Sequence, residues 1–159
     1  MWRTLSAEEV ELLAFALDGE RCALPVRDVR EVLRAALPAR LPKAPPVVTG
    51  ALNVRGEIVP LLDVRGRFGF APRPLAPEDH IVITHISQRP VGFVVDHVDD
   101  VVRLDRSDIT PGSAVAAGVE HMDGVARLPD GLLVIYDLHT FLSADELFAL
   151  DEARAEASE

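Results

Sequence analysis

Residues 50–69 read GALNVRGEIVPLLDVRGRFG, and this stretch decides the fold of the chain. Its apolar runs surround a tight turn at Arg55 and Gly56, which predicts a pair of strands within residues 47–63. We expect the Arg55 side chain to project from this turn rather than to pack inside the domain. A rigidly held arginine loses little entropy on binding and offers a planar set of donors to a carboxylate. Arg55 is therefore a candidate contact for a partner, and a merely solvated turn residue is the alternative.

Further strands extend outward from this hairpin in both directions. Apolar residues on either side of Asp18 and Gly19 predict a second hairpin, formed by residues 10–17 and 21–24. Strands are also predicted at residues 81–86, 91–95, 101–104, 119–127 and 132–137. The proline-rich stretches 38–46 and 70–79 predict extended connections, and residues 107–118, which lack periodicity, predict a loop. The pattern is therefore that of a mainly β protein.

The C-terminal end of the chain predicts a helix. Ser143 and Glu146 form a capping box, and Leu147, Phe148 and Leu150 supply an apolar side. Residues 143–159 are accordingly assigned to a C-terminal helix and tail. Beyond Asp151 the residues are mostly alanine and glutamate, so we expect a frayed end.

One valine pattern occurs twice. The series Val26, Val29 and Val32 recurs 69 residues later, and the pair Gly50 and Asp63 recurs 74 residues later as Gly124 and Asp137. Chance recurrence in a valine-rich β protein is the alternative to a structural repeat. A repeat predicts two related barrels of about five strands each, at approximately residues 10–70 and 80–142, within one domain spanning residues 10–150.

Composition limits the function classes. The chain has 159 residues, 48% of them hydrophobic, and 16 basic against 26 acidic residues give a net charge of −10. Nucleic-acid affinity comes largely from basic groups, so this charge disfavours nucleic acid as a partner. Cys22 is the only cysteine, which excludes an intrachain disulfide and a cysteine-rich zinc site. No run approaches the roughly 18 apolar residues of a membrane helix, and the first residues do not resemble a signal peptide. We therefore expect a soluble cytoplasmic protein.

No arrangement of side chains indicates catalysis. The five histidines form no metal-binding motif, and Cys22 is expected to be a buried, inert thiol in a strand. Asp96, Asp99 and Asp100 do not have calcium-loop spacing, and we expect solvated acids at a strand edge. The sequence thus predicts no catalytic residue, no metal and no cofactor.

The segment around Arg55 closely resembles the characteristic motif of CheW, the adaptor of bacterial chemotaxis signalling. The resemblance rests on residues 53–60 and 63–68, supported by the Leu-Pro-x-Ala-Pro stretch at 41–45 and by the repeated valines. It covers roughly residues 10–150, and it departs from the family at Val54 and Val64, where leucine is usual. The resemblance implies two SH3-like five-stranded β-barrels packed together, with short helices and no enzymatic activity. It also implies a scaffold that couples chemoreceptor cytoplasmic tips to the regulatory domain of the histidine kinase CheA, recruited to membrane-associated receptor arrays.

Four positions take a role from this resemblance. Arg55 matches the family's receptor-contacting arginine, and Val29 and Glu31 match other positions implicated in receptor or array contacts. Val98, at the equivalent place in the second repeat, is expected to line a groove between the barrels where a receptor helix docks. The resemblance assigns no residue to kinase binding.

Two other functions fit the same barrels. One is a paralogous coupler of a pilus or surface-motility chemosensory pathway, which would share every barrel motif. The other is a detached regulatory domain of a kinase. Against the second, 159 residues leave no room for a receiver or an ATP-binding domain.

Overall fold

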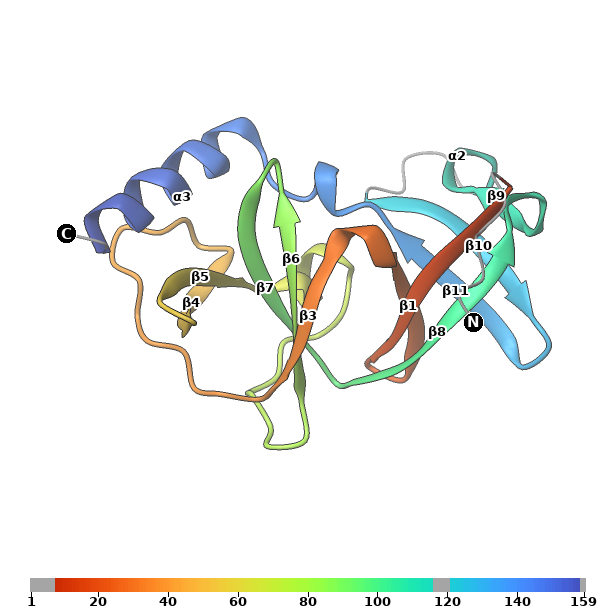
Figure 1. The fold of residues 1–159 in the computed structure, drawn as a ribbon, viewed down its shortest axis with the longest axis horizontal. Coiled ribbons are helices and arrows are strands. Elements are labelled where there is room, and N and C mark those ends of the chain that lie inside the picture. The colour runs from red at the N-terminus through yellow and green to blue at the C-terminus, as the bar shows by residue number, and fades with distance from the viewer. Residues whose placement is uncertain (1–7, 116–120, 158–159) are drawn as a thin grey trace.

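The computed structural model describes residues 8–115 and 121–157. Two curled β-sheets lie side by side, and one long C-terminal helix lies on the outer side of the second sheet (Figure 1). We call the two sheets, with the residues they enclose, the six-stranded barrel and the five-stranded barrel. Among the described residues, no helix is both long and apolar enough to cross a bilayer.

The six-stranded barrel combines strands from both ends of the chain. Its strand order is β8-β1-β2-β11-β10-β9. The strands are β1 (Glu9–Leu17), β2 (Glu20–Pro25), β8 (His97–Asp105), β9 (Ile109–Pro111), β10 (Met122–Leu128) and β11 (Gly131–Tyr136). Neighbouring strands run antiparallel except β2 and β11, which are parallel.

The five-stranded barrel comes from the middle of the chain, in the order β3-β6-β7-β5-β4. Its strands are β3 (Val29–Arg34), β4 (Val48–Val54), β5 (Glu57–Leu62), β6 (His80–Ile86) and β7 (Arg89–Val95). The pair β5 and β7 is the parallel one here. Short helical turns connect the strands: η1 (Val26–Asp28), α1 (Val64–Arg67), η2 (Arg106–Asp108), α2 (Gly112–Val115) and η3 (Leu138–Thr140).

The two barrels repeat one pairing pattern in register. In the six-stranded barrel β8 pairs with β1 so that Val101 lies opposite Leu13. Sixty-nine residues away, β3 pairs with β6 so that Val32 lies opposite Val82. The hairpins β10–β11 and β4–β5 likewise share a register shift, before Gly124 and before Gly50. The predicted repeat is therefore present, with both of its offsets.

The repeat units do not correspond to the barrels. Each sheet combines the first hairpin of one repeat with the second hairpin of the other, and the strand that follows each first hairpin crosses over. Thus β3 leaves the β1–β2 hairpin to pair with β6, and β8 leaves the β6–β7 hairpin to pair with β1. The predicted division at approximately residues 10–70 and 80–142 therefore does not describe the sheets. Non-local pairing of this kind leaves no local sequence signal.

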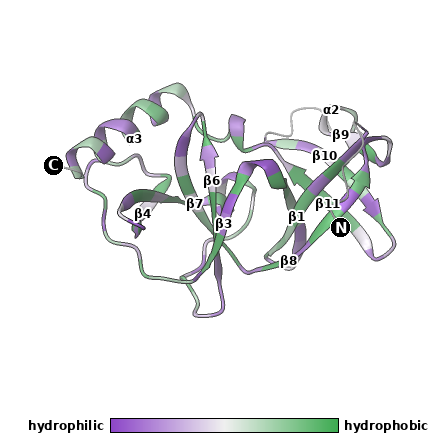
Figure 2. Ribbon diagram, in the orientation of Figure 1, coloured by the Kyte–Doolittle hydropathy of each residue, from purple (hydrophilic) through white to green (hydrophobic). Residues whose placement is uncertain are grey.

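A shared hydrophobic core joins the barrels. The largest cluster of buried residues draws on β1 and β2 from one sheet and on β6 and β7 from the other. At its centre the Phe15 and Phe93 rings meet edge to face, with centroids 5.8 Å apart. Each barrel also has a smaller core of its own, built around Leu133 in the six-stranded barrel and around Val59 in the five-stranded barrel. Figure 2 shows hydrophobic residues on the strands of both barrels.

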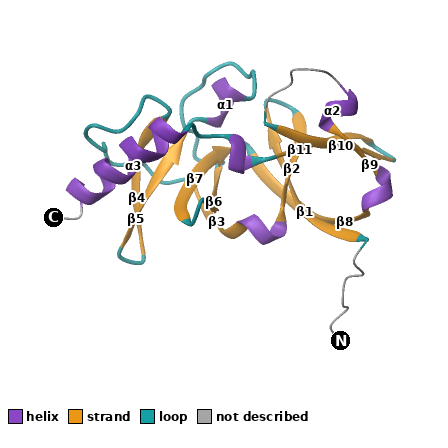
Figure 3. Ribbon diagram, turned by 90° about the horizontal axis from the view of Figure 1, so that it is seen from above, coloured by secondary structure: helices purple, strands orange, loops and turns teal. Residues whose placement is uncertain are grey.

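Helix α3 (Ala144–Ala157) covers only the five-stranded barrel (Figure 3). The predicted capping box is present: the Glu146 N–H donates to Ser143 Oγ at 3.1 Å, and the Ser143 N–H donates to Glu146 Oε1 at 3.0 Å. Leu150 and Ala153 are buried beneath the helix. The expected fraying beyond Asp151 is wrong, because Ala153 packs against the shared core and Arg154 donates to the Ile58 carbonyl at 3.3 Å.

Two further predictions need correction. Residues 107–118 were expected to form a loop, but the described part contains the end of η2, strand β9 and helix α2. Strand β9 forms because it pairs with β10 and completes a sixth strand, which the expectation of five strands in each barrel omitted. Strand β3 was not predicted, although its side chains alternate strictly between half-buried and exposed.

Candidate partner-binding site

The turn between β4 and β5 presents Arg55 as expected. Arg55 and Gly56 have φ angles of 54° and 86°, the left-handed pair that a two-residue hairpin turn requires. The Asn53 side-chain oxygen accepts a hydrogen bond of 2.8 Å from the Gly56 N–H and closes the turn. The Arg55 side chain is 75% exposed. A tightly closed turn therefore carries a guanidinium that faces solvent.

Glu31 lies directly beside this arginine. Arg55 Nη1 is 3.2 Å from Glu31 Oε2, although Glu31 is on β3, at the opposite edge of the sheet. The Glu31 side chain is only 16% exposed, and its Oε1 is buried without a hydrogen-bond partner among the described residues. An unsatisfied buried acceptor costs roughly 1–3 kcal/mol. This carboxylate is therefore placed where a donor from another molecule would stabilise it.

A second ion pair spans the same sheet edges. Arg30 Nη1 lies 2.5 Å from Glu57 Oε1, one residue away from the Glu31–Arg55 pair on each strand end. The hydrogen bond from Arg30 lowers the pKa of Glu57. Both acids are thus held next to arginines, and β3 is tied to the β4–β5 turn.

Val29 and Val98 occupy matching positions on the two crossover strands. Val98 lies opposite Phe15, and Val29 lies opposite Thr84, 69 residues further along the chain. Both valines are half-buried and pack against the shared core. Farther along the same strands, Val32 and Val101 are exposed. Of the four predicted site residues, the structure brings Arg55 and Glu31 into contact and places the two valines on the strands that connect the barrels.

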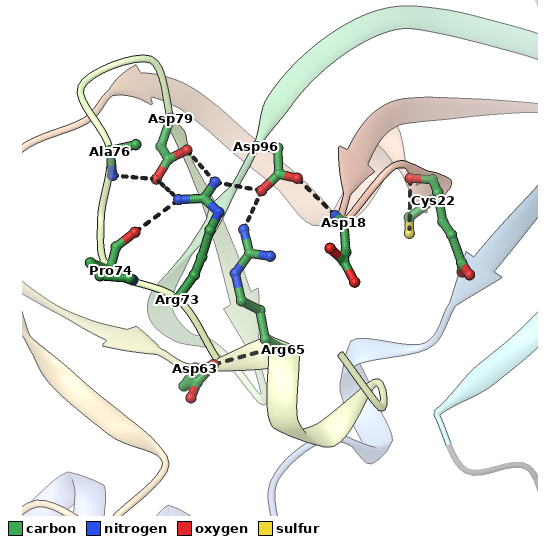
Figure 4. Close-up of polar contacts among 10 residues, drawn as sticks. Asp18, Cys22, Asp63, Arg65, Arg73, Pro74, Ala76, Asp79 and Asp96 are labelled. Carbon is green, nitrogen blue, oxygen red and sulfur yellow. Dashed lines mark hydrogen bonds and ion pairs between the residues drawn. The ribbon is translucent and has the colours of Figure 1, made fainter. Parts of the chain in front are cut away.

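Sequence reasoning missed a polar cluster that holds the 70–79 linker (Figure 4). Arg73 donates to Asp79 at 2.6 and 2.9 Å and to Asp96 at 2.6 Å. The buried Arg65, from α1, also pairs with Asp96. The second oxygen of Asp96 accepts 2.7 Å from the Asp18 N–H, in the β1–β2 turn. The expectation that Asp96 is a solvated acid at a strand edge is therefore wrong.

Hydrogen bonding outweighs burial at both carboxylates. Burial alone would raise the pKa of Asp79, but donors from Arg73 and from the Ala76 N–H lower it overall. The pKa of Asp96 is lowered in the same way, because Arg65 and Arg73 offset its desolvation. Only the pairing of the two arginines with alternating aspartates along the sequence could have indicated this cluster.

The described residues contain no candidate reaction centre. Cys22 is fully buried, as expected, and burial raises the pKa of its thiol to about 12, far from that of a nucleophile. Within residues 8–115 and 121–157, no group of three or more histidine, cysteine, aspartate or glutamate side chains is placed to hold a metal ion. The polar chemistry that faces solvent is that of ion pairing, at Arg55 and Glu31.

Comparison with known proteins agrees with this architecture. A family model described as the CheW-like domain matches residues 11–146. The chemotaxis protein CheW of Klebsiella aerogenes is 30% identical over 143 residues, covering 89% of this chain and 86% of that protein. Protein FrzA of Myxococcus xanthus is 31% identical over 131 residues, covering 79% of this chain and 81% of that protein.

A solved structure extends the likeness to three dimensions. The crystal structure of the scaffolding protein TtCheW from Thermoanaerobacter tengcongensis matches with a TM-score of 0.77 at 28% identity, covering 86% of this chain and 94% of that one. The resemblance found in the sequence is thereby confirmed. With the family model matched over most of two intertwined barrels, the chain belongs to the CheW-like domain family.

Proposed function

We propose that this protein is a non-enzymatic adaptor of chemotaxis signalling, which couples chemoreceptor cytoplasmic tips to the histidine kinase CheA. In this role it works in the cytoplasm and is recruited to membrane-associated receptor arrays. Membership of the CheW-like family and the names of the relatives, chemotaxis proteins and a scaffolding protein, support the proposal. The observation that carries it is the exposed Arg55 guanidinium, fixed on a closed turn beside a partly unsatisfied Glu31.

In this proposal the receptor contacts Arg55 and Glu31 together with the valines of the crossover strands. A receptor tip offers an amphipathic helix, whose apolar ridge suits a surface of β-branched side chains. Val29 and Val98 are half-buried on β3 and β8, and Val32 and Val101 extend this apolar surface on the same strands. Arg55 and Glu31 then act as polar groups at the rim, which contribute more to orientation and specificity than to affinity.

Charge reversal at Arg55 tests the proposal. Arg55→Glu places a second carboxylate beside Glu31, and we expect binding to a soluble receptor fragment to weaken by about tenfold or more, the scale of a lost charge-assisted contact. Isothermal titration calorimetry measures the affinity, and circular dichroism with a urea midpoint verifies the fold. Arg127→Glu, at an exposed arginine on β10, is the matched control and should bind like the wild type.

A charge swap separates binding from structure. Arg55→Glu combined with Glu31→Arg keeps an ion pair but reverses its direction. If the pair serves the receptor, the double variant stays folded and still binds weakly. Wild-type affinity in the folded double variant, or in Arg55→Glu alone, would contradict the proposal.

A further inference from the structure

The six-stranded barrel contains a cavity of about 550 Å³. Val10, Pro25, Ile109 and Ile135 supply apolar walls, and Arg27 is one of the charged residues that border it. None of the four residues assigned to receptor binding lines this cavity. It is therefore a feature that the proposed function does not use.

A smaller cavity of about 180 Å³ occupies the equivalent place in the five-stranded barrel. Two wall positions correspond at the 69-residue offset and two at the 74-residue offset. A fifth corresponds through packing, because a Cβ on Gly124 would touch Ile109 and a Cβ on Gly50 would touch Pro38. The equivalent pairs are Val10 and Asp79, Pro25 and Val94, Asp123 and Thr49, Ile135 and Leu61, and Ile109 and Pro38.

The chain itself narrows the smaller cavity. Residues 72–75 of the linker, Pro-Arg-Pro-Leu, form one of its walls. Arg73 anchors this extended segment by its bonds to Asp79 and Asp96 (Figure 4). The linker is thus an intramolecular ligand of the five-stranded barrel, with prolines on both sides of one charged anchor.

The six-stranded barrel has the same mould with more room and a different charge. Ala14 and Ala126, both fully buried, stand at the positions of Ile83 and Leu52, so its own core is smaller. At the positions of the two carboxylates that bind Arg73, it has Val10 for Asp79 and Arg27 for Asp96. Arg27 is exposed and pairs with no described residue. The group that complements this cavity is therefore a carboxylate on an otherwise apolar segment.

We propose that the cavity of the six-stranded barrel receives an extended, proline-containing segment of a partner protein. An acidic side chain of that segment pairs with Arg27, and its apolar residues contact Val10 and Pro25. The segment binds between proteins as the linker binds within the chain. Extended proline-rich segments suit this mode because little conformational entropy is lost on binding.

Peptides based on the linker sequence test this proposal on the full chain. The probes are acetylated and amidated Ala-Pro-Glu-Pro-Leu-Ala and its arginine counterpart, Ala-Pro-Arg-Pro-Leu-Ala, which is the sequence of residues 71–76. Each is titrated into isotopically labelled protein, and backbone amide shifts are followed by NMR. We expect shifts at Val10, Leu12, Val26 and Ile135, with the acidic peptide bound about tenfold more tightly, the scale of one charge-assisted hydrogen bond.

Variants of the cavity decide between charge recognition and non-specific contact. Arg27→Asp should abolish the preference for the acidic peptide. Val10→Asp with Arg27→Asp restores the carboxylate pair of the five-stranded barrel and should reverse the preference in favour of the arginine peptide. Arg55→Glu should leave both titrations unchanged, so failure of the receptor proposal would not affect this one.

Three results would overturn the inference. These are equal affinity for the two peptides, shifts that map elsewhere on the protein, and an unchanged preference in the double variant. Deletion of residues 1–7 tests the chain's own N-terminus as the occupant. If that deletion strengthens binding of the acidic peptide about tenfold or more, those residues compete for the cavity and the partner segment is the wrong occupant.

Discussion

The two barrels share one framework and differ in what is laid on it. Strand order, register shifts and the aspartates that cap η3 and α1 are the same in both, as expected of a repeat. Only the five-stranded barrel has a linker in its cavity and a long helix on its outer face. The hairpins show the effect: Ile58 is half-buried near α3, whereas its equivalent Leu132 is 58% exposed. The repeat thus supplies stability twice, while exposed surface differs between the barrels.

The shared core offers the strongest way to break this comparison. Phe15→Ala removes a fully buried ring that contacts Phe93 of the other barrel, and we expect a loss of about 3–5 kcal/mol in the free energy of unfolding. Urea denaturation followed by circular dichroism measures the loss. Hydrogen exchange at Leu133 and Val59, in the separate cores, reports on each barrel. Loss of protection in one barrel alone would show that the core does not couple them.

The helix that distinguishes the five-stranded barrel gives the next effect. Leu150→Ala removes a buried side chain of α3, which should cost about 2–5 kcal/mol. Phe148→Ala, on the same helix but 65% exposed, is the control and should change stability by less than about 0.5 kcal/mol. Equal losses in the two variants would mean that α3 does not pack through Leu150.

The linker anchor gives a smaller, pH-dependent effect. Asp79→Asn weakens the bonds to Arg73, and we expect a loss of about 1–3 kcal/mol at pH 7. Because the folded-state pKa of Asp79 is lowered, its contribution is present above the unfolded value of about 3.9 and is lost as the pH falls through the folded value. The difference between wild type and Asp79→Asn should therefore shrink below about pH 4.

Urea midpoints at pH 7, 4 and 3 measure this difference. Asp130→Asn, in a largely exposed pair with Arg21, serves as the control and should have little effect at any pH. A gap between wild type and Asp79→Asn that stays constant at low pH would show that the Asp79 carboxylate is not the stabilising group.

Local patterns predicted the hairpins well, because turn residues and apolar runs are local. The turns at Asp18-Gly19 and Arg55-Gly56 and the capping box at Ser143 are all present. The exchange of β3 and β8 between barrels was not predictable in this way, since a strand's partner depends on residues far along the chain. The repeat offsets were correct, but they mark equivalent positions and do not say which barrel each strand joins.

The site was predictable where one residue carries the signal and hidden where several converge. Arg55 stands out on a glycine-containing turn, and its exposure follows from that turn. Its contact with Glu31 depends on the two edges of a sheet approaching each other, which no local pattern reports. The buried Arg65 and Asp79 look like ordinary surface residues in sequence, because only the fold brings their partners to them.

The crossing of β3 and β8 has a consequence for how such a protein can arise. Neither repeat can complete a sheet alone, since each needs a hairpin and a strand from the other. A half-chain would have to associate with the other half or with a second copy of itself. The intertwined monomer is thus what results when the two chains of a strand-swapped homodimer are fused end to end, with the proline-rich linker as the joint.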